Sequence, residues 1–170
     1  MNQPPIINGW NIYAHAHFLT EFEALVIQVE NLRAKYPETY QQKKVTKRLA
    51  AIVKLVFEVI PQDPTRSEYR QGAALGDEYK HWFRAKFFQQ YRLFFRYHQE
   101  SKTIVYAWIN DENSKRAYES SSDAYKVFRK MLDSGSPPDD WDALLASTQG
   151  DLARWEEAIN LSETSNTENL

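Results

Sequence analysis

The stretch that decides the fold is HWFRAKFFQQYRLFFRYHQESKTIVYAWINDENSKR, residues 81–116. Read at a period of two, it predicts three β-strands, because successive side chains of a strand point to opposite faces. The three segments are WFRAKFF, QYRLFFRYH and TIVYAWIN. A short polar turn, Gln99 to Lys102, separates the last two. That turn favours an antiparallel hairpin and hence a small antiparallel sheet.

The first two strands have an apolar side and a basic side. No acidic residue lies between His81 and Gln99, and the same side carries four cations, Arg84, Lys86, Arg92 and Arg96. If the apolar sides face one core, these cations share the opposite face with Trp82. Cations for phosphates and aromatic rings for unpaired bases are typical of an RNA-binding surface. Alternatively, the cations only solvate the wet face of the sheet.

Before the strands, residues 4–15 predict an extended arm, because Pro4-Pro5 and Asn8-Gly9 oppose helix. Apolar residues then recur at helical spacing from Phe18 to Leu32. A second helix is expected over about residues 40–59. The short break between the two predicts an antiparallel helical hairpin laid across the apolar face of the sheet.

After the strands, Ser122 or Asp123 can cap another helix whose apolar side includes Tyr125 and Phe128, and Gly135 can stop it. Short helical pieces are expected around residues 141–146 and 151–161. The final stretch SETSNTENL is expected to be disordered. The sequence thus predicts an α+β fold with an N-terminal helical hairpin, a C-terminal helix and a helical extension.

Length and composition limit the possible classes of protein. A chain of 170 residues with 42% apolar residues can bury one core, and no window approaches the ~18 apolar residues that span a membrane. We therefore expect a cytoplasmic protein. The absence of cysteine excludes disulfides, thiolate nucleophiles and zinc–cysteine sites. His15 and His17 give only a weak metal signal, so no metal and no cofactor are predicted.

Charge divides the chain into two parts. From Asp133 onward, nine acidic residues stand against Arg154 alone, which leaves 20 basic and 14 acidic residues in the remainder. This division predicts a domain over residues 1–133 and an acidic, partly helical extension over residues 134–170. A basic body suggests an anionic ligand that the extension masks. The alternative is that the extension only promotes solubility.

Several segments together resemble the RelE-like toxins of bacterial toxin–antitoxin pairs, and most nearly the YhaV toxins. The resemblance covers about residues 8–141. It rests on NGW (8–10), YAH (13–15), YRLFFRY (91–97), W-I-NDEN (108–113), SDAY (122–125) and PPDDW (137–141). It implies a RelE-like fold and an endoribonuclease that cuts messenger RNA, often on translating ribosomes. It also implies a PrlF-like antitoxin with an AbrB-like fold as the partner.

The resemblance also implies site residues. Arg84 and Lys86 match basic positions of the first strand, and Arg92 matches an arginine of the second. Arg92 is the expected phosphate clamp, because a guanidinium can hold two phosphate oxygens at once. Tyr118 matches a tyrosine after the third strand. A basic residue of the preceding loop corresponds loosely to Lys115 or Arg116, which are expected to contact RNA. Apart from the resemblance, Trp82 and Arg96 on the predicted basic face are expected to add RNA contacts.

The chain departs from the RelE pattern at NDEN, residues 110–113, where a basic cluster is expected. Asp111 or Glu112 could accept the 2′-hydroxyl proton, but the same residues are equally typical of a turn. Tyr118 could stack on a base, donate a proton or only pack. A non-catalytic relative that binds RNA, the ribosome or only a protein partner is therefore the alternative function.

Overall fold

The chain forms an α+β fold around a five-stranded mixed sheet, described by a computed structural model over residues 3–117 and 120–167. The strands are β1 (Ile6–Ile7), β2 (Trp10–Ala14), β3 (Phe83–Phe87), β4 (Tyr91–His98) and β5 (Thr103–Ile109). Their order across the sheet is β1-β2-β5-β4-β3. The predicted strands β3, β4 and β5 are confirmed, and they pair antiparallel as expected.

The N-terminal arm is part of the sheet, so the expectation of a purely antiparallel sheet was wrong. Asn8 and Gly9 both have positive φ, which lets β1 and β2 form a tight hairpin. β2 then pairs parallel with β5 and places β5 in the centre of the sheet. Seven consecutive buried residues in β5 reflect that central position.

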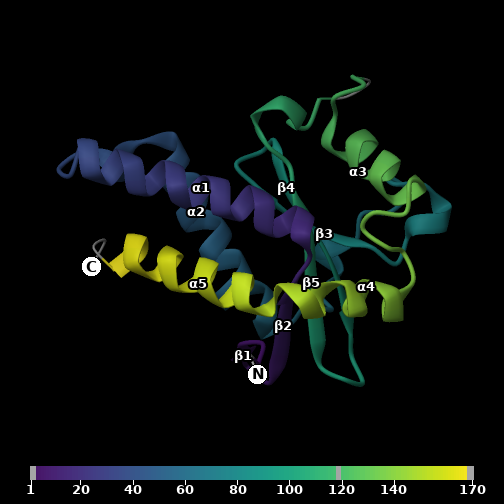
Figure 1. The fold of residues 1–170 in the computed structure, drawn as a ribbon. Coiled ribbons are helices and arrows are strands. Elements are labelled where there is room, and N and C mark those ends of the chain that lie inside the picture. The colour runs from purple at the N-terminus through teal and green to yellow at the C-terminus, as the bar shows by residue number, and fades with distance from the viewer. Residues whose placement is uncertain (1–2, 118–119, 168–170) are drawn as a thin grey trace.

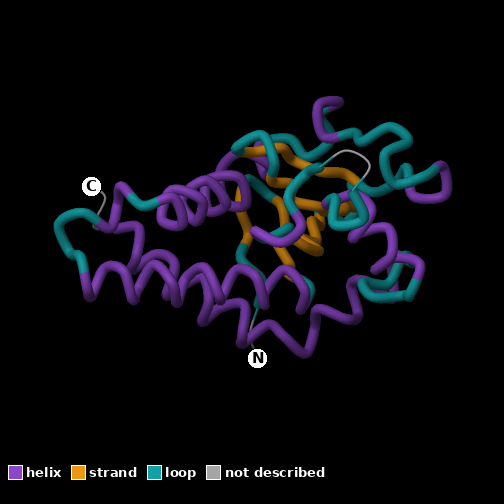
Figure 2. The backbone as a smooth tube through the Cα atoms, turned by 90° about the horizontal axis from the view of Figure 1, so that it is seen from above, coloured by secondary structure: helices purple, strands orange, loops and turns teal. Residues whose placement is uncertain are grey.

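One face of the sheet packs against α1 (Ala16–Lys35), α2 (Lys44–Lys54) and α5 (Leu152–Thr167) (Figure 1). Phe18 and Phe22 of α1, Leu49 of α2 and Trp155 of α5 are all buried in this main core. The long helices project well beyond the strands, as Figure 2 also shows from above. Within the described residues, no helix combines the length and apolar character needed to cross a membrane.

The opposite face of the sheet is covered as well, so the prediction of an open basic face was wrong. α3 (Ala124–Asp133) and α4 (Trp141–Thr148) lie over it and form a second core. Trp82, Phe94 and Phe128 are completely buried there. The rings of Phe94 and Phe128 stack with centroids 4.3 Å apart. The large aromatic residues among the cations therefore pack against α3 and are not exposed to solvent.

The helices differ from the predicted ranges at their ends. α2 ends at Lys54, and a π-helical turn, Leu55–Val59, follows it directly. In that turn the carbonyl of Val56 accepts a hydrogen bond from the buried Tyr106 hydroxyl at 2.8 Å. α5 continues to Thr167, so the expectation of disorder was wrong from Ser162 to Thr167. Residues 168–170 lie outside the described part of the chain.

Candidate active site

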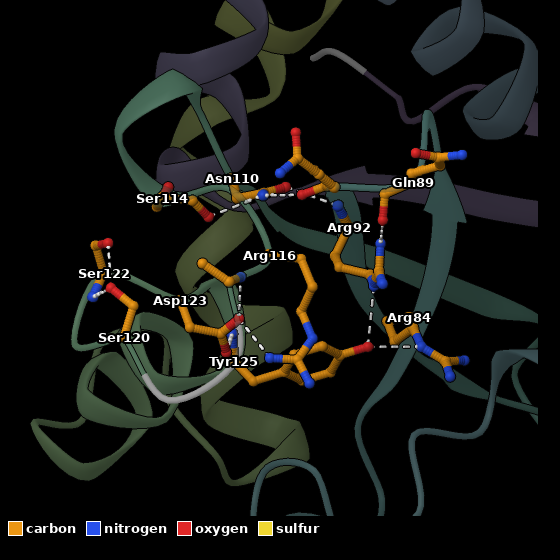
Figure 3. A network of polar contacts seen from close by, with 12 residues as sticks. Arg84, Gln89, Arg92, Asn110, Ser114, Arg116, Ser120, Ser122, Asp123 and Tyr125 are labelled. Carbon is orange, nitrogen blue, oxygen red and sulfur yellow. Dashed lines mark hydrogen bonds and ion pairs between the residues drawn. The ribbon is translucent and has the colours of Figure 1, made fainter.

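Three arginines surround one tyrosine where β3, β4 and α3 meet (Figure 3). The Tyr125 hydroxyl accepts hydrogen bonds from Nε of Arg84, at 2.9 Å, and from Nε of Arg92, at 3.0 Å. The guanidinium of Arg116 lies over the Tyr125 ring, 4.7 Å from its centroid. We call Arg84, Arg92, Arg116 and Tyr125 the Tyr125 cluster. It joins two strands, a loop and a helix.

The strand register explains why the two strand arginines meet at this point. Arg84 pairs with Phe94 across the β3–β4 ladder, and Lys86 pairs with Arg92. Directly paired residues of an antiparallel sheet project their side chains to the same face. Arg84, Lys86 and Arg92 therefore share the α3 side of the sheet, as the sequence predicted for these three. Lys86 is exposed, and its partner across the ladder, Arg92, belongs to the Tyr125 cluster.

Arg92 is held rigidly, and only 6% of its surface is exposed. Its guanidinium donates to the carbonyls of Gln89, at 2.7 Å, and Tyr91, at 2.9 Å. Its backbone N–H donates to the side chain of Asn110 at 2.7 Å. Asn110 in turn donates to the carbonyls of Gln90 and Ser114, each at 2.9 Å. The first residue of NDEN thus fixes the start of β4 against the loop that carries Arg116.

Asp123 positions the tyrosine and the third arginine. Its side chain, 2% exposed, caps α3 by accepting the Tyr125 N–H at 3.1 Å, and it also accepts the Ala117 N–H at 2.7 Å. It forms an ion pair with Arg116 as well. Burial by itself would raise the pKa of the Asp123 carboxyl. The hydrogen bonds from Arg116 and the backbone outweigh burial, so the pKa lies below its usual value.

This arrangement suits phosphate chemistry. Guanidinium groups stabilise negative charge as it builds on a phosphate, and they are fixed here before any ligand binds. A phenol oxygen that accepts two hydrogen bonds still carries its own proton, which it can donate. The Tyr125 cluster therefore combines charge stabilisation with one proton donor.

Asp111 and Glu112, the two candidate acceptors of the 2′-hydroxyl proton, both bind neighbouring groups of the protein. Asp111 accepts from the Asn113 N–H at 2.9 Å and from the Ser114 hydroxyl at 2.8 Å, and so caps a 3₁₀ turn. The structure thus favours the turn interpretation for Asp111. Glu112 binds Arg48, Tyr91 and Lys115. Neither carboxylate contacts the Tyr125 cluster.

The remaining predicted residues lie elsewhere. Trp82 is completely buried against Phe128, so its ring offers no surface to a base. The guanidinium of Arg96 lies 5.5 Å from the ring centroids of both Trp82 and Trp141, and it donates to the carbonyl of Asp139. The linker between α3 and α4 thus covers Arg96. Burial lowers the pKa of this guanidinium. The predicted Tyr118 lies outside the described residues.

Sequence reasoning missed Tyr125 as a candidate site residue and placed it only on the apolar side of a helix. The ring does pack edge-on against Phe94, 5.6 Å away, so that prediction was correct for the ring. Its hydroxyl reaches the arginines. A signal was present in SDAY, because a capping aspartate two residues before a tyrosine fixes that side chain at the first turn of the helix.

The described residues contain no group of three or more histidine or acidic side chains placed to hold a metal ion. His15 and His17 lie at the start of α1, where His15 accepts the His17 N–H at 3.0 Å and serves as the helix cap. His81 contacts Asp139 at 2.6 Å. These histidines therefore have local structural partners.

Comparison with known proteins agrees with this geometry. One family model, described as a toxin with endonuclease activity of a toxin–antitoxin system, matches residues 12–149. The protein is therefore a toxin of the endonuclease class. Two relatives are the ribonuclease toxin YhaV of Escherichia coli K12 and toxin YhaV of Escherichia coli O157:H7. Each is 46% identical over 151 residues, which cover 88% of this chain and 98% of the relative.

The chain belongs to the YhaV toxin family. The match continues to residue 149, so it includes α4 and passes the point at Trp141 where the resemblance was expected to end. No solved structure matches the chain.

Proposed function

We propose that this toxin is a metal-independent endoribonuclease that cuts messenger RNA in the cytoplasm, on the ribosome or free of it. The observation that carries the proposal is the Tyr125 hydroxyl, which accepts hydrogen bonds from Arg84 and Arg92. The ribonuclease name of the relative from strain K12 supports RNA as the substrate. The α+β fold, with α1, α2 and α5 on one face of the sheet and α3 and α4 on the other, is consistent with a RelE-like fold.

In the proposed reaction, the 2′-hydroxyl oxygen attacks the adjacent phosphorus atom, its proton passes to solvent water, and the bond to the 5′-oxygen breaks. Arg84, Arg92 and Arg116 stabilise the negative charge that builds on the phosphate oxygens. Tyr125 donates its hydroxyl proton to the departing 5′-oxygen, as a general acid. Lys86, exposed beside Arg92, adds a further positive charge for the incoming strand.

The products provide the direct test. Attack by the 2′-hydroxyl leaves a 2′,3′-cyclic phosphate and a 5′-hydroxyl end, whereas attack by water leaves other ends. Purified protein is incubated with a messenger RNA in the presence of EDTA, and both new ends are mapped. We expect cyclic phosphate and 5′-hydroxyl ends at full yield. New 5′-phosphate ends, or cleavage that EDTA abolishes, would overturn the mechanism.

Partner and growth effects are tested in cells. Membership of a toxin–antitoxin family implies an antitoxin, and we propose a PrlF-like protein with an AbrB-like fold. Induction of the toxin alone should arrest growth and create new messenger 5′-ends, and co-expression of that antitoxin should prevent both effects. Arrest without cleavage would instead support the non-catalytic, ribosome-binding alternative. Cuts found in naked RNA as well as on ribosomes would show that the ribosome is not required.

A further inference from the structure

A basic pocket lies on the other side of β4 from the Tyr125 cluster. Tyr91 and Arg92 are consecutive, so their side chains leave β4 on opposite faces. Arg92 joins the Tyr125 cluster, whereas Tyr91 reaches a cavity of about 360 Å³ between α2 and the β3–β4 turn. We call this cavity the α2 pocket. It is lined by Lys44, Lys47, Arg48, Phe88, Tyr91, Glu112 and Lys115.

Four of these seven lining residues are cations, and Glu112 is the one acid among them. Lys44 and Lys47 are exposed, and within the described residues their side chains form no ion pair or hydrogen bond. Consecutive turns of α2 therefore present two unneutralised ammonium groups to the same cavity. The α2 pocket is positive even though the whole chain carries a formal net charge of -2.

The α2 pocket already binds one carboxylate, the side chain of Glu112. One carboxylate oxygen accepts from the Tyr91 hydroxyl at 2.5 Å and from Arg48, and the other lies 2.8 Å from Nζ of Lys115. Hydrogen bonds from Lys115 and Tyr91 lower the pKa of this carboxyl to about 2. Its side chain is nevertheless 59% exposed. Three donors that converge on a carboxylate can equally serve a phosphate.

Phe88 supplies an aromatic surface at the rim of the α2 pocket. It is 52% exposed, which is unusual for a phenylalanine, and it occupies the β3–β4 turn with φ +46°. The next residue, Gln89, has φ +60°. Bulky side chains adopt this left-handed conformation at a cost of about 1 kcal/mol or more, where glycine or asparagine is preferred. Stability alone therefore does not explain this phenylalanine, whereas an exposed ring can stack on a base.

We propose that the α2 pocket is a second RNA-binding subsite, which holds a nucleotide of the single strand that flanks the scissile bond. Its phosphate binds Lys44, Lys47 and Arg48, and its base stacks on Phe88. This inference rests on the proposed ribonuclease function. The chain connects the two sites twice, through Tyr91–Arg92 and through Lys115–Arg116, so one strand can reach both around the β3–β4 turn.

The test uses the full-length protein and a short, fluorescein-labelled 2′-O-methyl RNA, which lacks the attacking hydroxyl and remains intact. Binding is measured by fluorescence anisotropy between about 50 and 200 mM salt, where phosphate contacts determine the slope. The main variant is Lys44→Gln/Lys47→Gln. Its control is Lys54→Gln/Lys130→Gln, which removes the same charge from exposed positions outside both sites.

We expect the pocket variant to bind weakly and to lower the slope of log K against log salt by about 1.4, since each lost single-strand phosphate contact contributes about 0.7. The control variant should change the slope little. Glu112→Gln should act in the opposite direction and tighten binding severalfold, because it removes the negative charge that competes with phosphate. Equal slopes for both double variants, or weaker binding by Glu112→Gln, would overturn the proposal.

Phe88→Asn separates stacking from folding. Asparagine tolerates positive φ, so this variant should unfold at a higher temperature than the wild type. Loss of the ring should nevertheless weaken RNA binding by roughly tenfold or more. A stabilised variant that binds RNA like the wild type would contradict the stacking role.

Cleavage assays distinguish failure of this inference from failure of the proposed function. If the wild type neither cleaves nor binds RNA, both are wrong. If the wild type cleaves and the pocket variants bind and cleave at wild-type levels, only the subsite is wrong. If those variants keep RNA binding and lose the antitoxin instead, the α2 pocket is a protein-binding surface and the RNA subsite is refuted.

Discussion

Tyr125→Phe is the sharpest test of the candidate active site, because it removes one oxygen atom and keeps the ring. A general acid typically contributes about 10²- to 10⁴-fold, so single-turnover RNA cleavage should fall by that factor. The packing of the ring against Phe94 and under Arg116 should remain. The expected loss is therefore chemical rather than structural.

The stability cost of Tyr125→Phe follows from the two arginines that lose their acceptor. Nε of Arg92 is buried, and an unsatisfied buried donor costs about 1–3 kcal/mol. Arg84 is partly exposed, so water can replace the lost oxygen at little cost. We therefore expect the free energy of unfolding in urea to fall by about 2 kcal/mol. Cleavage must be measured at a temperature where the variant is fully folded.

Tyr79→Phe is the matched control for this experiment. The Tyr79 hydroxyl donates to Asp133 at the other end of α3, at 2.6 Å, and does not touch the Tyr125 cluster. Its loss should destabilise the protein by about 1 kcal/mol and leave the cleavage rate unchanged. If Tyr125→Phe cleaves within about threefold of the wild type, well short of a 10²-fold effect, Tyr125 is not the general acid.

Three further predictions concern stability. Asp123→Ala should lower the free energy of unfolding by roughly 3 kcal/mol, because it removes both the cap of α3 and the partner of Arg116, and Asp123→Asn, which keeps the cap, should cost less. Burial, followed by the charge of His17, lowers the pKa of His15 from 6.5 to about 4. The unfolded chain therefore binds the proton first, and up to roughly 3 kcal/mol of stability should be lost as the pH falls from 6.5 to 4. His15→Asn should flatten that part of the pH–stability curve in urea titrations. Trp155→Ala should cost about 3–5 kcal/mol and Trp155→Phe less, measured in the same way, whereas independence of stability from Trp155 would show that α5 does not hold the main core.

Strand periodicity correctly assigned side chains to faces but could not show what covers each face. Arg92 and Phe94 do share a face, as the period of two requires. Whether that face is exposed to solvent depends on Phe128, which belongs to α3, later in the chain, and stacks on Phe94. A large aromatic residue between two arginines was the available signal. Pairing between distant segments, including the parallel β2–β5 ladder, leaves no comparable signal in a single sequence.

The sequence predicts the geometry of the candidate site where local rules determine it and misses that geometry where tertiary contacts determine it. Arg84, Lys86 and Arg92 follow from the alternation of the strands. The cap at Asp123 follows from the sequence before a helix, and the structure confirms it. Helix periodicity predicts only that the ring of Tyr125 is buried in the core. It does not predict the partners of the Tyr125 hydroxyl. Only the approach of β3 and β4 gives that hydroxyl its partners.

The acidic extension is built into the fold, which changes how masking should be tested. Its α4 places Leu144 in the second core, and its α5 places Trp155 in the main core. Trp155 also donates to the Ile12 carbonyl at 3.1 Å. Truncation at Ser134 would therefore remove parts of both cores, and a change in RNA binding would report unfolding rather than unmasking. The covering that the structure does show is local: the carbonyl of Asp139 accepts a hydrogen bond from Arg96, and the ring of Trp141 lies against the guanidinium of Arg96.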